Sequence, residues 1–187
     1  MSAVARVPEP SHVPEIDLTR MRRRHLRRVL TIEGSVYPRP WSASLFLSEL
    51  TQRGTRSYLV ARHRGEVIGY AGMMFTGFEA HVTNIAVDPG WHGRKIGSKL
   101  LLALITEAIA RASNRVSLEV RVTNQVAQAM YEKFGFHATG VRKGYYIETN
   151  EDALIMVVDD VSTTEYRLLL QRLRTELDDL VQGGNDA

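Results

Sequence analysis

The chain has 187 residues, a formal net charge of +3, 44% hydrophobic residues and no cysteine. This length and composition indicate one soluble globular domain with a full core, and the lack of cysteine excludes disulfides, thiolate metal sites and a cysteine nucleophile. The chain shows neither a signal-peptide segment nor an apolar run of about 18 residues, so we expect a cytoplasmic protein without a membrane span.

The N-terminal part is expected to form an extension followed by two helices. Residues 1–13 are rich in proline and poor in apolar residues, which predicts a flexible extension before a domain over residues 14–160. Apolar residues at helical spacing predict a first helix over 18–36. The prolines at positions 38 and 40 end this helix, and Ser42 is a candidate N-cap for a second helix that runs to residue 50.

Strands and helices are expected to alternate in the middle of the chain. A hairpin with its turn at Arg64-Gly65 joins the first two predicted strands, and Gly135 is a candidate C-cap. This order predicts an α/β (α+β) fold with a mixed central sheet of about six to seven strands flanked by helices. The predicted strands lie at 57–63, 67–76, 81–87, 116–122, 137–147 and 153–158, and the helices at 96–112 and 125–134.

The last segment, residues 161–187, lies outside this alternation. Leucines between Leu169 and Leu180 recur at spacings of three and four, which predicts an extra C-terminal amphipathic helix that ends at Gly183-Gly184. Two interpretations stay open. The favoured one is a helix that packs on its own domain, and the other is a leucine seam that forms a homodimer.

The clearest functional signal lies between residues 84 and 98. An apolar strand leads into a turn with glycine and two cationic residues, and a helix begins directly after it. This order brings together unpaired backbone N–H groups, the positive end of a helix dipole and two positive side chains. Such a place binds a polyanion, most simply the diphosphate of a nucleotide-containing cofactor.

The run Asn-Ile-Ala-Val-Asp-Pro and the turn after it resemble the acetyl-CoA site of GNAT-superfamily N-acetyltransferases, whose usual turn is Gln/Arg-x-x-Gly-x-Gly/Ala. His92 stands at the Gln/Arg position and Lys95 at the central glycine. We therefore expect the backbone at Lys95 to keep a conformation that an L-residue tolerates, with its side chain adding charge. The resemblance implies a GNAT fold and acetyl-CoA as co-substrate, contacted by Ile85, Ala86, Val87, Gly93, Arg94, Lys95, Ile96, Gly97, Ser98 and Asn124.

The strand over 116–122 carries the candidate proton acceptor. Alternation places Ser117, Glu119 and Arg121 on one face, so Glu119 should face a wet cleft, and a surface ion pair with Arg121 is the alternative. Residues 118–136 resemble the catalytic half of RimI-type ribosomal-protein-alanine N-acetyltransferases. The resemblance implies Glu119 as proton acceptor and Tyr131 as proton donor, and an ordinary core tyrosine is the alternative for Tyr131.

The resemblance to the RimI type extends over roughly residues 18–158. In that family the helix break and a paired-tyrosine hairpin border the peptide cleft, which implies substrate contacts from Glu33, Tyr37, Trp41, Tyr145 and Tyr146. It implies the N-terminal alanine of a small-subunit ribosomal protein as acceptor. A lysine or small-molecule amine N-acetyltransferase is a second possibility. A non-catalytic acyl-CoA-binding regulatory module is a third, because His92 and Lys95 depart from the usual turn.

Two other features of the sequence bear on binding. Six arginines lie within nine residues of the first predicted helix, at positions 20, 22, 23, 24, 27 and 28. They are compatible with nucleic-acid contact, but no nucleic-acid motif or stacking aromatic accompanies them, so a solvated helix face is favoured. The six histidines lack metal-ligand spacing, and no metal is expected.

Overall fold

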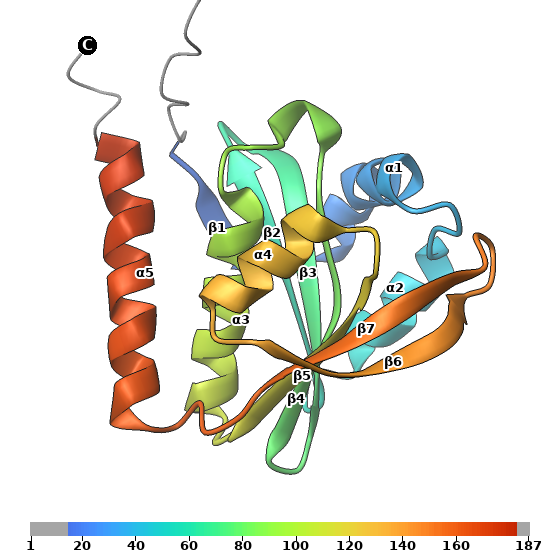
Figure 1. Cartoon of the computed structure of the whole chain (residues 1–187). Helices are drawn as coiled ribbons and strands as arrows, with labels where there is room; N and C mark the ends of the chain where they lie inside the picture. Colours follow the sequence, from blue (N-terminus) through green and yellow to red (C-terminus); the bar gives the residue numbers. More distant parts are fainter. Residues whose placement is uncertain (1–14, 183–187) are drawn as a thin grey trace, which may run out of the picture.

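The computed structural model describes residues 15–182, and within them seven strands form one sheet between two layers of helices (Figure 1). The expected mixed sheet flanked by helices is therefore confirmed. The predicted extension over 1–13 lies outside the described residues, as does the Gly183-Gly184 end of the last helix. The strands are β1 (Asp17–Arg20), β2 (Arg56–His63), β3 (Glu66–Thr76), β4 (Glu79–Val87), β5 (Arg115–Arg121), β6 (His137–Tyr146) and β7 (Glu151–Val158).

Each face of the sheet is covered by its own group of helices (Figure 1). One face carries α1 and α2, which bury Phe46 and Tyr70 between them and the sheet. The other face carries α3 and α4, with α5 packed beside them against the larger core cluster. The helices are α1 (Leu26–Val36), α2 (Ala43–Thr51), α3 (Ile96–Ala110), α4 (Gln125–Lys133) and α5 (Thr164–Gln182).

The strand order is β1-β2-β3-β4-β5-β7-β6, and every neighbouring pair is antiparallel except β4 and β5. The parallel pairing of β4 with β5 is short, because it joins only Glu79–His81 to Arg115–Ser117. Beyond His81 the two strands separate. The sheet therefore opens a gap at its centre, between the second half of β4 and the second half of β5.

A bulge in β4 lies where the gap begins. Gly72 of β3 pairs with Asn84, but the next residue, Met73, pairs with Val82, so Thr83 is an extra residue in β4. A side chain on Gly72 would overlap Tyr58 and Asn84, which explains why glycine is needed here. Such a bulge increases the local bend and twist of its strand. We infer that it helps to turn β4 away from β5.

The predicted helix over 18–36 is wrong in its first eight residues. Asp17–Arg20 forms the edge strand β1, a 3₁₀ turn follows at Arg23–His25, and α1 begins only at Leu26. β1 pairs with β2, and the backbone N–H of Met21 still donates to the Tyr58 carbonyl. The physical reason is the exposed edge of β2, whose unpaired N–H and C=O groups β1 satisfies.

The local signals for turns and caps are confirmed. The Ser42 side chain accepts a hydrogen bond from the backbone N–H of Leu45 at the start of α2. Arg64 and Gly65 both have positive φ, at 48° and 87°, as a tight hairpin turn requires. Gly135 follows α4 with φ at 84°, the left-handed conformation that ends many helices.

The C-terminal helix α5 packs on its own domain, as the favoured interpretation expected. Tyr166, Leu170 and Leu177 are buried in the same core as α3 and α4. The Tyr166 hydroxyl donates to the backbone carbonyl of Phe134 over 2.8 Å. Leu168 and Leu180 stay exposed. Between residues 15 and 182, no helix combines the length and apolar character needed to cross a membrane.

Candidate active site

The gap between β4 and β5 exposes backbone groups of Ile85 and Val87. Asp88 donates its backbone N–H to the Ile68 carbonyl of β3. Because antiparallel bonding alternates along a strand, Ala86 also bonds β3, and the N–H and C=O groups of Ile85 and Val87 point into the gap. Of the three residues expected to contact the cofactor here, Ile85 and Val87 thus offer backbone groups, whereas Ala86 faces β3 with a buried side chain.

Two side chains contact the backbone carbonyls of Ile85 and Val87 that face the gap. The Tyr37 hydroxyl donates to the Ile85 carbonyl over 2.9 Å. The His92 Nε2 atom lies 2.9 Å from the Val87 carbonyl. This leaves the N–H groups of Ile85 and Val87 as donors along one wall of the gap. A carbonyl oxygen placed beside them would be polarised as in an oxyanion hole.

The turn before α3 has a glycine-like backbone at a lysine. Lys95 has φ at 58°, so the expectation that it would avoid a glycine-type conformation is wrong. The left-handed region costs an L-residue roughly 1 kcal/mol. Gly93, with φ at 78°, also has positive φ. The turn therefore has, at Lys95, a backbone conformation that glycine adopts more easily, and the Lys95 side chain is exposed.

The start of α3 provides donors for an anion. Gly97 and Ser98 lie in the first turn, where backbone N–H groups have no partner within the helix. The Arg94 guanidinium is stacked 4.8 Å from the centre of the Trp91 ring, beside the turn. The Ile96 side chain is buried and anchors the helix. Two cations and free N–H groups at the positive end of a 15-residue helix fit a diphosphate.

Asn124 has a structural task besides its predicted cofactor contact. Its Oδ1 atom accepts a hydrogen bond of 3.1 Å from the Ala127 N–H and so caps α4. Among the residues that the structure describes, none accepts a hydrogen bond from its Nδ2 group, which can therefore donate to a ligand.

Glu119 lies on β5 at the gap, held by partners from two other strands. Its Oε2 atom is 3.0 Å from His81 Nε2 on β4, and its Oε1 atom is 3.3 Å from an Arg142 guanidinium nitrogen on β6. The side chain is 8% exposed. The hydrogen bond from His81, with smaller contributions from the charges of His81 and Arg142, holds the pKa of Glu119 below its ordinary value. Glu119 is therefore an ionised carboxylate at neutral pH.

The alternation predicted for β5 is confirmed, but the alternative interpretation, a surface ion pair between Glu119 and Arg121, is wrong. Val116, Leu118 and Val120 are buried, and the residues between them are partly exposed. Arg121 does not pair with Glu119. It binds Glu148 over 2.9 Å and Glu151 over 2.8 Å, at the turn between β6 and β7.

His81 and Arg142 are the site residues that sequence reasoning missed. His81 is the last residue of β4 paired with β5, opposite Ser117, and its Nδ1 atom is 2.9 Å from the Ser117 hydroxyl. This contact fixes the ring while Nε2 faces Glu119. His81 is the first residue of the predicted strand that leads into the cofactor turn, and this position is a signal from which a site role could be predicted. No local pattern connects Arg142 to Glu119.

Three tyrosines, Tyr37, Tyr131 and Tyr146, lie near enough to affect one another's pKa, and the Tyr37 hydroxyl is bound at the gap. Burial raises the pKa of Tyr131, and the neighbouring Tyr146 phenol adds to this increase. Burial likewise raises the pKa of Tyr37, with Tyr131 and Glu33 as further causes. Tyr131 is thus a neutral phenol at physiological pH, able to donate a proton or a hydrogen bond.

The remaining predicted residues border this region from two connections. Tyr145 and Tyr146 lie at the end of β6 with ring centres 5.1 Å apart, and Arg121 stacks on Tyr146 at 3.8 Å. In Figure 1 the β6–β7 hairpin extends toward the connection between α1 and α2, where Trp41 lies. Trp41 packs on Phe46 with ring centres 5.3 Å apart.

Glu33 is buried at the C-terminal part of α1. Its Oε1 atom accepts a hydrogen bond of 2.9 Å from the Trp41 backbone N–H, which ties the α1–α2 connection to the helix. Burial raises the pKa of Glu33. Among the described residues nothing bonds its other carboxyl oxygen. Of the predicted substrate residues, Glu33 is the most enclosed, with 2% exposure.

Comparison with known proteins agrees with this geometry. The acetyltransferase (GNAT) family pattern matches residues 26–136. A Bacillus subtilis (strain 168) protein provisionally named [ribosomal protein bS18]-alanine N-acetyltransferase is 38% identical over 74% of this chain and 91% of its own length. The Escherichia coli (strain K12) [ribosomal protein bS18]-alanine N-acetyltransferase is 36% identical over 68% of this chain and 86% of its own length.

The crystal structure of the Escherichia coli ribosomal-protein-S18-alanine N-acetyltransferase superposes on this chain with a TM-score of 0.71 and 30% identity. The superposition covers 78% of this chain and 94% of that one. The structure adds a gap between β4 and β5, a turn before α3 whose free N–H groups fit an anion, and a carboxylate at the gap. The chain therefore belongs to the GNAT acetyltransferase family and is an N-acetyltransferase that uses acetyl-CoA.

Proposed function

We propose that this enzyme acetylates the α-amino group of a protein N-terminus, that of the alanine of ribosomal protein bS18. The similarity to proteins named for this reaction supports the acceptor. The observation that carries the proposal is the position of the Glu119 carboxylate, ionised and held by His81 at the opening between β4 and β5. A base at this position suits an amine that arrives from the side of the α1–α2 connection.

The proton chemistry favours an N-terminal amine over lysine. An α-amino group has a pKa of about 7.7–8.0, so roughly a tenth of it is neutral at pH 7, whereas a lysine near 10.4 is neutral about once in 2,500. A carboxylate of lowered pKa is a weak base, but it suffices for an amine that loses its proton readily. Glu119 receives the amine proton, and Arg142 and His81 keep the carboxylate oriented.

Acetyl-CoA supplies an activated thioester, so the amine can attack without a covalent enzyme intermediate. The N–H groups of Ile85 and Val87 stabilise the negative charge that develops on the carbonyl oxygen. Tyr131 donates to the departing sulfur. This sulfur is a tolerable leaving group because a thiol such as that of cysteine has a pKa of about 8.5. Gly97, Ser98, Arg94 and Lys95 hold the diphosphate at α3.

The peptide lies between the α1–α2 connection and the β6–β7 hairpin. Tyr145 and Tyr146 provide flat aromatic walls with few rotamers, which suit an extended peptide. Tyr37 and Trp41 border the opposite side. We assign Glu33 an indirect part in this contact, because its carboxylate holds the Trp41 backbone.

Acetylation of synthetic peptides tests the proposal. A peptide that copies the N-terminus of bS18 should be acetylated at its α-amine, and the same peptide with a blocked N-terminus and an internal lysine should not. Modification of the blocked peptide would favour a lysine acetyltransferase. Binding of acetyl-CoA without acetylation of any amine would favour a regulatory module. Mass spectrometry of ribosomal proteins from cells with and without this enzyme identifies the acceptor directly.

A further inference from the structure

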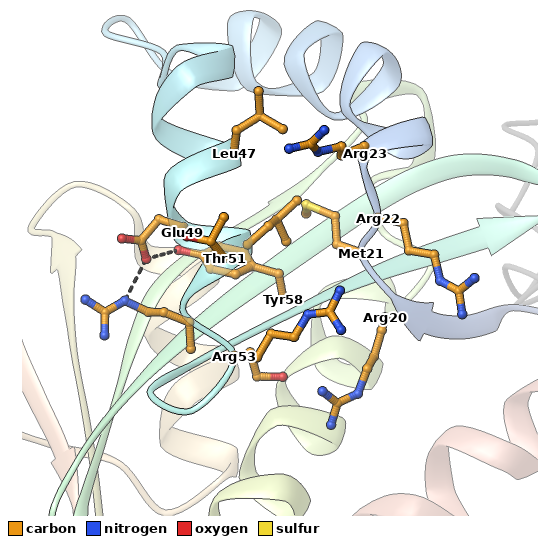
Figure 2. A pocket seen from close by; sticks show the side chains of 12 residues that line it. Arg20, Met21, Arg22, Arg23, Leu47, Glu49, Thr51, Arg53 and Tyr58 are labelled. Atoms are coloured by element: carbon orange, nitrogen blue, oxygen red, sulfur yellow. Dashed lines mark hydrogen bonds and ion pairs between the residues drawn. The ribbon is translucent and has the colours of Figure 1, made fainter.

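A basic cleft of about 640 Å³ lies away from the gap. It lies beside the start of α1 and the end of α2, whereas Trp41 lies between the end of α1 and the start of α2. It is bordered by the end of β1, the 3₁₀ turn, the end of α2 and the start of β2 (Figure 2). Glu49 is the one carboxylate among the described residues that line it. Five arginines line the same cleft: Arg20, Arg22, Arg23, Arg53 and Arg56.

Two of these arginines have a carboxylate partner within the chain. Arg56 Nε is 2.7 Å from Glu49, whose carboxylate also accepts a hydrogen bond from the Tyr58 hydroxyl. Arg20 lies 3.4 Å from Glu107 but stays 65% exposed. In the part of the chain that the structure describes, no carboxylate lies within ion-pair distance of Arg22, Arg23 or Arg53. The cleft therefore holds positive charge that the described residues do not balance.

We propose that this cleft binds phosphate groups of RNA. The guanidinium is planar and matches two phosphate oxygens at once, and it is more weakly hydrated than an ammonium, so clustered arginines favour phosphate over a diffuse counterion layer. Figure 2 shows Arg20, Arg23 and Arg53 around one hollow rather than spread over a flat face. The buried Tyr58 and Met21 close its floor and offer no stacking surface, so the contact is with the backbone, not with bases.

The position of the cleft favours RNA over an acidic protein, and this step rests on the proposed function. A ribosomal protein is itself a partner of RNA, so its N-terminus is presented beside phosphates. α1 has 11 residues and separates the cleft from the α1–α2 connection. At 1.5 Å per residue this is about 16 Å. RNA held at the cleft would thus lie about one helix length from the α1–α2 connection, which borders the proposed peptide path, and would raise the local concentration of the peptide.

Fluorescence anisotropy with a labelled 12-nucleotide oligouridine, at 50 and 200 mM salt, tests the cleft. The variant carries Arg23→Glu and Arg53→Glu, and the matched control carries Lys133→Glu and Arg172→Glu, which change the net charge equally at exposed positions on α4 and α5. We expect at least tenfold weaker binding for the cleft variant at 50 mM salt and a salt slope reduced by about 1.4, since each single-strand phosphate contact contributes about 0.7. The control should stay within twofold of the wild type.

An equal loss of oligouridine affinity in the cleft variant and the control would overturn the proposal, because it would show that the net charge of the protein binds RNA without a specific site. A 12-residue polyglutamate that displaces the oligouridine with equal affinity would also overturn it, in favour of an acidic protein partner. The milder pair Arg23→Gln and Arg53→Gln serves if the reversed charges impair folding, as judged by thermal unfolding. Acetylation of a short peptide should be unchanged in the cleft variant. Failure of the wild type in that assay would count against the proposed function, whereas failure of RNA binding alone would count against the cleft.

Discussion

His81 Nε2 lies 3.0 Å from Glu119 Oε2, across the point where β4 and β5 separate. His81 belongs to the last paired position of β4, and Glu119 comes two residues after its partner Ser117 on β5. The contact thus connects the two strands where their backbone bonds end. It keeps the carboxylate at the opening of the gap, away from Arg121, which is bound to the β6–β7 turn. The orientation of the proposed base depends on the neighbouring strand.

Glu119→Gln should lower kcat about 100-fold or more while the KM for acetyl-CoA stays within twofold. The amide keeps the shape and hydrogen-bonding reach of the side chain but cannot accept the amine proton, and general bases contribute about 10²–10⁴ in rate. Steady-state kinetics with a bS18 peptide measures both quantities. Glu132→Gln, at an exposed position of α4, is the matched control and should behave as wild type. A Glu119→Gln enzyme of normal kcat would remove Glu119 from the mechanism.

The pH profile should report the substrate amine rather than Glu119. The pKa of Glu119 is lowered by its hydrogen bond with His81, so the carboxylate is already ionised throughout the range from pH 5 to 9. The α-amine gains a proton as pH falls below about 7.7–8.0, and kcat/KM should then decrease about tenfold per pH unit. His81→Phe removes the first cause of the lowered pKa of Glu119, so that pKa should rise toward its ordinary value. Rates between pH 4 and 9 for both proteins measure this, and a wild-type profile flat below pH 7 would contradict it.

Three substitutions at Lys95 separate charge from backbone strain. Lys95→Ala removes the charge but keeps an L-residue at φ of 58°, and Lys95→Gly removes both the charge and the strain. The glycine variant should therefore be more stable than the alanine variant by about 1 kcal/mol, measured by chemical denaturation. Both should raise the KM for acetyl-CoA moderately, and Lys95→Glu should raise it further because like charges then meet at the diphosphate. An unchanged KM in all three would place the diphosphate elsewhere.

Much of the fold was predictable because its signals are local. The alternation along β5, the Ser42 cap and the Arg64-Gly65 turn each depend on a few adjacent residues, and each is as predicted. The sequence predicts too long a first helix because Leu18 and Met21, three residues apart, suit a helix as well as an edge strand. Only the free edge of β2, nearly 40 residues later, decides between them.

The site was predictable in its residue types but not in its partners. Glu119 meets His81 from β4 and Arg142 from β6, and these contacts depend on the strand order β4-β5-β7-β6. A single sequence contains no local record of that order. The left-handed backbone at Lys95 was missed for a different reason, because the requirement of the turn outweighs the preference of the residue.

Two leucines of α5 distinguish packing on the domain from self-association. Leu177 is 6% exposed and lies in the core beside α3, whereas Leu168 is 54% exposed. Leu177→Ala should lower the free energy of unfolding by about 2–4 kcal/mol, because it removes buried methyl groups and leaves a cavity, and Leu168→Ala should change it by less than about 0.5 kcal/mol. Urea denaturation of both variants measures this, and gel filtration at several concentrations shows whether either changes the oligomeric state.

If Leu168→Ala were the more destabilising and its effect grew on dilution, the exposed face of α5 would be an interface between copies. The predicted order of the two effects follows only if α5 is a part of the folded domain, because the buried leucine then contacts residues of the same chain at every concentration.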